Sequence, residues 1–184
     1  MATVSTRTAN WRLFGGGGLA VGGLLWALHA VLVRAGVLAL GPWVFVIALI
    51  VLGSAVLFVA FGETGSNGAV GNNVLGKIAL AIYAAGFVVV AVNAFASLGG
   101  VTTVLAVILI INGGLLSAFV IFYEGVAKGI ARWALFVPAL LGQLWAFGFF
   151  ALPSFSELWW IPLLVALSLL VTGVLYLFNS RKRG

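Results

Sequence analysis

The chain contains no cysteine and no aspartate, and only 7% of its 184 residues are charged. Without cysteine it has no disulfide, no thiol nucleophile and no thiolate metal ligand, so cysteine usage does not indicate a redox compartment. Three glutamates and one histidine are too few for the ligand sets of zinc, di-iron or bis-histidine haem sites. We therefore expect no metal and no cofactor.

Sequence motifs of known catalytic sites are also missing. The chain has no Gly-x-Ser-x-Gly turn, no His-Glu-x-x-His helix and no phosphate-binding Walker loop. Nucleophilic, metal-assisted and nucleotide-driven reactions would therefore lack the residues that they need. An enzyme is the class that the sequence favours least.

Apolar residues are abundant instead: they make up 64% of the chain, and the mean hydropathy is +1.30. They form six runs, each near the ~20 residues that cross the ~30 Å hydrocarbon core of a bilayer. The runs are Leu13–Val33, Trp43–Gly62, Ile78–Ser97, Thr103–Tyr123, Trp133–Leu152 and Leu158–Phe178. The sequence predicts one all-α domain over residues 1–184, an integral membrane bundle of six transmembrane helices.

The basic residues are distributed unequally between the two ends of these runs. Eight fall on one side of the expected membrane, and Arg34 alone falls on the other. The eight are Arg7, Arg12, Lys77, Lys128, Arg132, Arg181, Lys182 and Arg183. Because cytoplasmic loops carry an excess of Lys and Arg, we expect a plasma-membrane protein with both termini in the cytoplasm.

The formal net charge of +6 could also indicate a nucleic-acid partner. The basic residues occupy helix ends rather than one continuous patch, so nucleic acid is not expected. The lipid bilayer and its anionic headgroups are the simpler partners. Arg181, Lys182 and Arg183 would each gain about 1 kcal/mol at the inner leaflet. A homo-oligomer or a larger membrane complex is compatible with this composition.

Two internal repeats compete. In the even-numbered runs a glycine is followed five residues later by phenylalanine, at Gly53 and Phe58, Gly114 and Phe119, and Gly173 and Phe178. This spacing favours three helical hairpins. The rival repeat matches Gly22-Gly23-Leu24-Leu25 with Gly113-Gly114-Leu115-Leu116 and would give two inverted halves of three helices, as in many transporters.

Polar side chains inside the runs are the candidate binding residues. Ser54, Asn112 and Gln143 fall near the middle of the second, fourth and fifth runs, so a bundle could bring them to one depth. An unpaired amide in hydrocarbon costs several kcal/mol, so each should face the bundle interior. They could bind a substrate at the midplane or serve as hydrogen bonds between helices. Asn93, Tyr83 and Thr172 extend this set into at most a narrow path.

His29 lies near the outer end of the first run, shortly before Arg34. It could sense pH or relay protons, and the alternative is an interfacial histidine bonded to a carbonyl or to water. At the cytoplasmic edge, Glu124, Lys128 and Arg132 are spaced four apart. This spacing predicts one helical face with a Glu124 to Lys128 ion pair.

Three hairpins, cytoplasmic termini and glycine-bearing even runs resemble the HdeD family of small bacterial membrane proteins associated with acid stress. The residues that carry the resemblance are the stretch from Val46 to Ala55 and the turn Leu152-Pro153, whereas Leu98-Gly99-Gly100 lacks a matching proline. The resemblance implies a six-helix fold and an envelope-stress role, and it implies no catalytic residue.

Two functions follow as hypotheses. The first is a non-catalytic membrane protein that acts in envelope stress or as an accessory subunit of a membrane complex. The alternative is a small-solute transporter or substrate-binding membrane subunit that uses Ser54, Asn112 and Gln143 as its midplane site.

Overall fold

A computed structural model describes residues 11–37, 41–62, 68–151 and 160–179. Within these residues all regular elements are helical, and the only β-type pairing is an isolated bridge between Gly68 and Gly71. In chain order they are the π-helical turn η1 (Trp11–Gly16), α1 (Gly17–Arg34), α2 (Gly41–Phe61), α3 (Val74–Ala96), α4 (Gly100–Glu124), the 3-10 turn η2 (Gly129–Arg132), α5 (Phe136–Ala151) and α6 (Trp160–Leu177). The chain is all-α, as the sequence predicts.

Among the described residues, five helical segments are long and apolar enough to cross a membrane. They are Trp11–Arg34, Gly41–Phe61, Val74–Ala96, Gly100–Glu124 and Trp160–Leu177. Their length and composition indicate a multi-pass membrane protein. The segment expected to be the fifth span is shorter: α5 has 16 residues, a length of about 24 Å at 1.5 Å per residue. That is less than the ~30 Å hydrocarbon thickness.

Pro138 explains why α5 begins at Phe136 rather than at Trp133. Proline has no N–H, so the carbonyl of Ala134 cannot receive the usual helical hydrogen bond from residue 138. The hydroxyl of Thr172 on α6 donates to this carbonyl instead, at 2.9 Å. The chain before α5 is therefore tied to α6 by a side chain, and its own turn η2 ends at Arg132.

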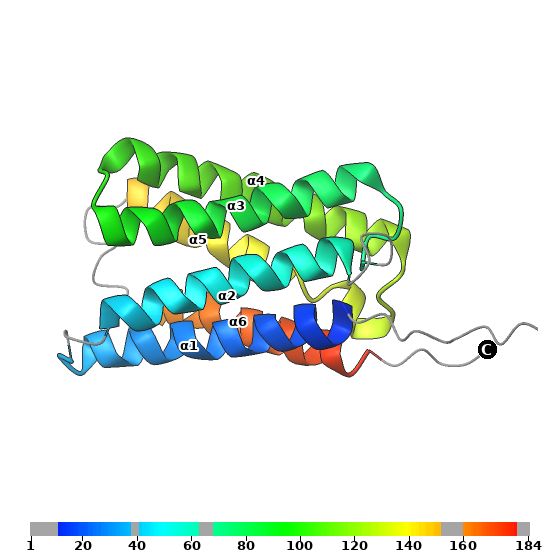
Figure 1. Ribbon diagram of the computed structural model, residues 1–184, viewed down its shortest axis with the longest axis horizontal. Coiled ribbons are helices and arrows are strands. Elements are labelled where there is room, and N and C mark those ends of the chain that lie inside the picture. Colours follow the sequence, from blue (N-terminus) through cyan, green and yellow to red (C-terminus); the bar gives the residue numbers. More distant parts are fainter. Residues whose placement is uncertain (1–10, 38–40, 63–67, 152–159, 180–184) are drawn as a thin grey trace, which may run out of the picture.

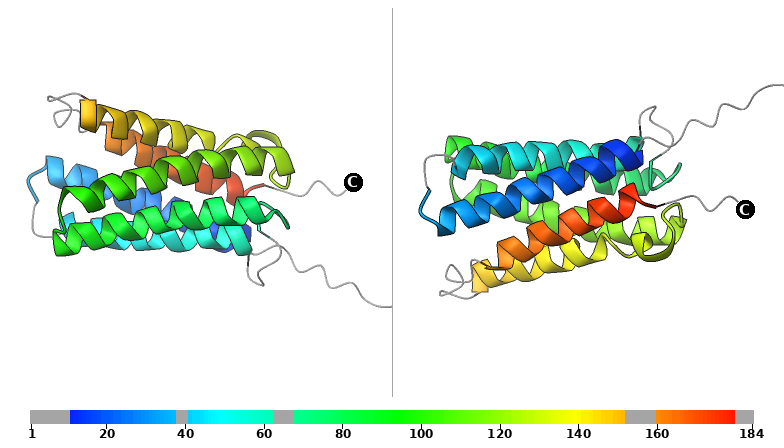
Figure 2. Two further views of the ribbon diagram at one scale, coloured as in Figure 1. Left: turned by 90° about the horizontal axis from the view of Figure 1, so that it is seen from above. Right: turned by 90° about the horizontal axis from the view of Figure 1, so that it is seen from below.

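The six helices form a closed ring. Each packs against its neighbours along the chain, and α1 also packs against α6. In Figure 1, α1, α2 and α3 lie in front, with α5 and α6 behind them, and the two views of Figure 2 show the same arrangement from above and below. The interior of the ring is mainly apolar and includes Leu52, Val56, Phe87 and Leu169, all almost fully buried.

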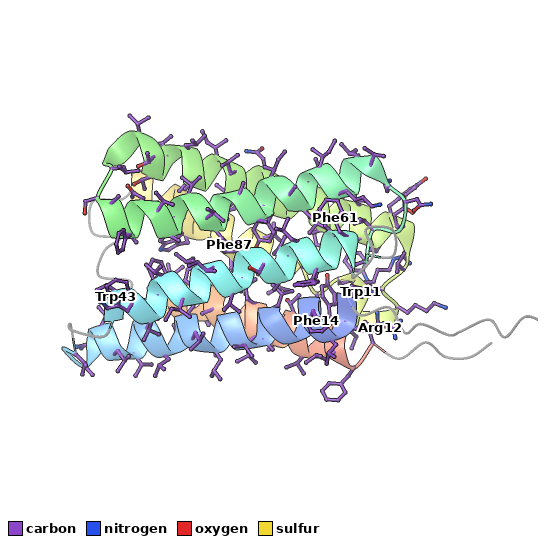
Figure 3. The ribbon with its side chains drawn as sticks, viewed as in Figure 1. Trp11, Arg12, Phe14, Trp43, Phe61 and Phe87 are labelled. Atoms are coloured by element: carbon purple, nitrogen blue, oxygen red, sulfur yellow. The ribbon has the colours of Figure 1, made fainter. Side chains whose placement is uncertain are left out.

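The end of the bundle that holds the start of η1 and the end of α6 is called the terminal end below (Figure 1). There the rings of Trp11 and Tyr176 meet edge to face, with centroids 5.5 Å apart. Trp11 and Arg12 lie at this end, and Trp43 lies at the opposite end (Figure 3). Both described ends of the chain are therefore on the same side of the bundle.

Glycines allow two helix pairs to approach closely. A Cβ added at Gly23 of α1 would lie 2.6 Å from the backbone nitrogen of Leu170 on α6. A Cβ at Gly113 of α4 would lie 2.5 Å from the backbone nitrogen of Tyr83 on α3. Since no larger residue fits against a neighbouring backbone at these distances, the α1–α6 and α3–α4 contacts depend on the absence of a side chain.

The glycines of the hairpin repeat lie at comparable places. Gly53 faces Ala84 and Phe87 of α3, Gly173 faces Gly16 and Ala20 of the first helical segment, and Gly114 lies between Tyr83 of α3 and Ala139 of α5. Each of the three therefore contacts the helix that follows its own around the ring. The two repeat schemes themselves stay predictions.

Candidate functional site

The three residues expected to form a midplane site do not converge. Ser54 on α2 and Asn112 on α4 are exposed, and Gln143 on α5 is half-buried. α2 packs against α1 and α3, whereas α4 packs against α3 and α5, so Ser54 and Asn112 lie on separate faces of the ring. This placement differs from the expectation that all three face the bundle interior.

Asn112 satisfies only part of its hydrogen-bonding capacity within its own helix. Its Nδ2 donates to the carbonyl oxygen of Ile108 at 2.8 Å. A carboxamide has two N–H donors and an acceptor oxygen. In the part of the chain that the structure describes, no second bond to Asn112 is formed. One donor and the carbonyl oxygen are left facing outward.

The residues around Asn112 form an apolar stripe along the outer surface of α4. The stripe, called the α4 outer stripe below, consists of Val101, Leu105, Ile108, Asn112, Leu116, Phe119 and Tyr123, all exposed and spaced three or four residues apart. Residues at that spacing share one face of a helix. Asn112 is the single amide of the stripe and lies near the middle of α4.

The buried polar groups of the ring are different residues. Ser117 bonds the carbonyl of Gly113 one turn back along α4, and Thr172 bonds Ala134 as described above. The Tyr176 hydroxyl and the Asn179 Nδ2 are buried without a hydrogen-bond partner among the described residues. Tyr83, also fully buried, contacts Phe87 and Gly114. The two hydroxyls that have partners, those of Ser117 and Thr172, bond backbone carbonyls rather than other polar side chains.

Asn93 does not belong to such a path either. Its amide joins the two threonines that follow it, accepting from the Thr102 hydroxyl at 2.7 Å and donating to Thr103 Oγ1 at 3.0 Å. Thr102 also bonds the carbonyl of Gly99, which has a positive φ of 96°. The group therefore holds the tight α3–α4 turn.

His29 joins the end of α1 to the start of α2. Its Nδ1 donates to the carbonyl oxygen of Gly41 at 2.8 Å, and its ring stacks on Phe45 with centroids 4.6 Å apart. This bond requires the proton on Nδ1 and leaves Nε2 as the other titratable position. The geometry is that of the interfacial histidine bonded to a carbonyl, and the pH-sensing hypothesis stays a prediction.

The cluster of Glu124, Lys128 and Arg132 is not one helical face. α4 ends at Glu124, and its C-cap Gly125 has a φ of 64°, a left-handed conformation that glycine adopts at helix ends. Lys128 follows in the connection to η2. The Glu124 carboxylate accepts a hydrogen bond from Asn73 Nδ2 at 2.8 Å. Asn73 also caps α3 by accepting from the Gly76 N–H, so it ties the start of α3 to the end of α4.

Aromatic side chains gather at the terminal end where α4 finishes and α5 begins. Phe122 contacts Trp133 with ring centroids 4.2 Å apart, and Phe119 contacts Phe136 at 5.0 Å. The Arg132 guanidinium lies over the Phe122 ring, 4.3 Å from its centroid. Sequence reasoning placed Trp133 at a span end and Arg132 in the cytoplasm, but it did not bring either residue to this aromatic cluster.

Comparison with known proteins does not assign a family. No family model, no curated protein sequence and no solved structure matches this chain.

Proposed function

We propose that this chain is a non-catalytic, multi-pass membrane protein that acts as an accessory subunit and packs laterally against another transmembrane helix. The observation that carries the proposal is the outward position of Asn112 at the centre of the α4 outer stripe. A polar side chain at this depth normally faces protein rather than lipid. Asn112 faces neither the ring interior nor a described neighbour.

A partner helix would supply the hydrogen-bond partner for the Asn112 amide that lipid cannot. Asparagine side chains form hydrogen bonds across membrane helices, typically worth ~0.6 kcal/mol each, and model peptides give about 1–2 kcal/mol. The flanking Ile108 and Leu116 are exposed and would pack against the same partner. The stripe combines an apolar contact surface with one group that specifies register, as a single buried asparagine does in coiled coils.

The distribution of charge supports the proposed orientation. Arg12, Lys77, Lys128 and Arg132 lie at the terminal end, and Arg34 lies at the opposite end. Arg7, Arg181, Lys182 and Arg183 are outside the described residues. The positive-inside rule then places the terminal end, and both termini, in the cytoplasm of a plasma-membrane protein with six spans. α5 spans in this proposal because it runs alongside the other five helices (Figure 2).

The transport alternative receives no comparable support. Ser54 and Asn112 are exposed on different helices, and most of the buried side chains in the ring are apolar. An HdeD-like envelope-stress role stays a hypothesis that is compatible with an accessory subunit, because either function works without a catalytic site.

The absence of cysteine makes a clean crosslinking test possible, since any introduced cysteine is unique. Leu116→Cys places a probe one turn from Asn112 on the α4 outer stripe. In native membranes we expect a crosslinked band of discrete mass, and its size separates a second copy from a different protein. Adding Asn112→Leu should remove the band while leaving the helical content and the thermal midpoint unchanged.

Ile47→Cys, an exposed residue on α2, is the matched control and should give no discrete band. The accessory-subunit proposal is wrong if Leu116→Cys behaves like Ile47→Cys, or if the band persists at full intensity after Asn112→Leu.

A further inference from the structure

Two hollows flank the start of α5. One, of about 670 Å³, lies between α4 and α5 and is lined mainly by Phe119, Phe122, Tyr123, Trp133 and Phe136. The other, of about 450 Å³, lies between α5 and α6 and includes Trp133, Val137, Leu141, Leu164 and Val171. Their volumes fall within the range of ligand pockets. Trp133, the first residue after η2, lines both hollows.

Apart from Tyr123 and Trp133, whose rings are exposed, the polar side chains of the hollows are already engaged by the protein. In the first, Asn73 bonds Glu124 and the Gly76 N–H. In the second, Ser168 bonds the carbonyl of Val165, and Thr172 bonds that of Ala134. Their occupant therefore needs no hydrogen-bonding groups along its length. The two apolar hollows are therefore suited to binding hydrocarbon chains.

A cation lies next to the residue that the two hollows share. Arg132, directly before Trp133, lies with its guanidinium over the groove-lining ring of Phe122. Its Nε donates to the carbonyl of Phe122, and the described residues give its terminal Nη atoms no acceptor. A guanidinium presents its donors in a planar fork that matches phosphate oxygens. The free part of the fork is available to a ligand.

The surrounding charges and aromatic rings fit a lipid headgroup at this depth. Lys128 is exposed in the same connection, and Glu124 is the one acidic residue at the terminal end among those described, against four basic ones. Tyr123 is 84% exposed and Trp133 is 55% exposed. Tyrosine and tryptophan are enriched at the level of the headgroups. A positive field over an aromatic belt attracts negatively charged lipid.

We propose that the start of α5 is a binding site for one anionic diacyl phospholipid, with its phosphate on Arg132 and one acyl chain in each hollow, so that the lipid straddles α5. The cation of Arg132, next to the tryptophan that both apolar hollows share, distinguishes this site from the general lipid-facing surface. α5 packs less closely against α4 and α6 than the other helices of the ring pack against their neighbours, and the lipid fills the space that this leaves beside α5.

Competition between two lipids tests the site. Detergent-purified protein is mixed with equal amounts of phosphatidylglycerol and phosphatidylcholine, and the retained lipid is counted by native mass spectrometry. We expect one phosphatidylglycerol per chain to be retained in preference to phosphatidylcholine. Arg132→Gln should lower that preference about fivefold, the loss expected for one basic contact. Arg34→Gln removes the same charge from the opposite end and should leave it unchanged.

A second measurement locates the lipid independently of Arg132. Phosphatidylglycerol with brominated acyl chains quenches tryptophan fluorescence at short range, and Trp133→Phe should remove a larger share of the quenching than Trp43→Phe. If Arg132→Gln unfolds the protein, the tryptophan comparison decides whether the lipid lies beside the start of α5.

Three results would overturn the proposal. The first is equal retention of the two lipids by the wild-type protein. The second is a loss of preference in Arg34→Gln as large as that in Arg132→Gln. The third is a protein adduct formed through Val137→Cys in native membranes, which would show that a helix rather than a lipid covers the α5–α6 hollow.

Discussion

The contacts of α1 and of α5 differ although both helices are apolar and both hold glycine. On α1, a Cβ added at Gly23 would lie 2.6 Å from a backbone atom of α6, while a Cβ at Gly142 on α5 would meet nothing within 4 Å. The same residue type therefore marks close helix approach in one place and open space in another. The contacts that join α6, α1, α2, α3 and α4 in turn are all extensive, and α5 is the loosely held member.

The largest expected effect comes from adding a side chain at the close contact between α1 and α6. Gly23→Ala forces a methyl group against the backbone of α6, which cannot move as a flexible side chain would. We expect the free energy of unfolding to fall by about 3 kcal/mol, the upper range for overpacking. Thermal unfolding in detergent, followed by circular dichroism, measures it. A change below the error of the measurement would show that α1 and α6 are not in close contact.

Thr172→Val tests the link that holds the start of α5. The substitution keeps the shape of the side chain but removes the hydroxyl that bonds Ala134, whose carbonyl has no helical donor because of Pro138. Leaving a buried carbonyl unsatisfied should lower the unfolding free energy by about 1.5 kcal/mol. Ser168→Ala, a half-buried hydroxyl that bonds only its own helix, is the control and should have a smaller effect.

Tyr176→Phe should have the opposite sign. The Tyr176 hydroxyl is buried without a partner among the described residues, so its removal takes away a desolvated polar group and keeps the ring against Trp11. We expect a gain of about 1 kcal/mol in unfolding free energy. A loss of stability instead would mean that the hydroxyl is bonded within the bundle.

Gly142→Ala is the smallest effect and completes the comparison with Gly23→Ala. The new methyl group enters open space, and alanine is favoured over glycine inside a helix by roughly 0.8 kcal/mol. A small rise in the thermal midpoint is expected. If both substitutions destabilise equally, the contrast between α1 and α5 is wrong.

The sequence predicted the helices better than the faces they turn inward. α2 and α6 begin and end within two residues of the expected runs, because long apolar segments in lipid form helices. A helix that is apolar all round carries no polar face to orient it. The sequence therefore could not decide whether Ser54 and Asn112 point inward.

The glycines contained the missing information. Gly53 and Gly113 are buried at helix contacts, and each directly precedes or follows a candidate polar residue. Neighbouring residues are about 100° apart around a helix of 3.6 residues per turn. A buried glycine thus turns Ser54 or Asn112 toward the outer surface. The hollows beside α5 were less accessible to prediction, because they depend on how closely α5 packs against α4 and α6 in three dimensions.

Closure of the ring by α1 and α6 has a consequence for biosynthesis. The first helical segment leaves the ribosome long before the last one is made. Gly16 and Gly23 of this segment nevertheless pack directly against the backbone of α6. During translation this glycine surface faces either lipid or the insertion machinery until residues 160–177 emerge. A nascent chain that ended before α6 would leave the contact surface of α1 without its partner. The last helix is therefore the one that completes the packing of the first.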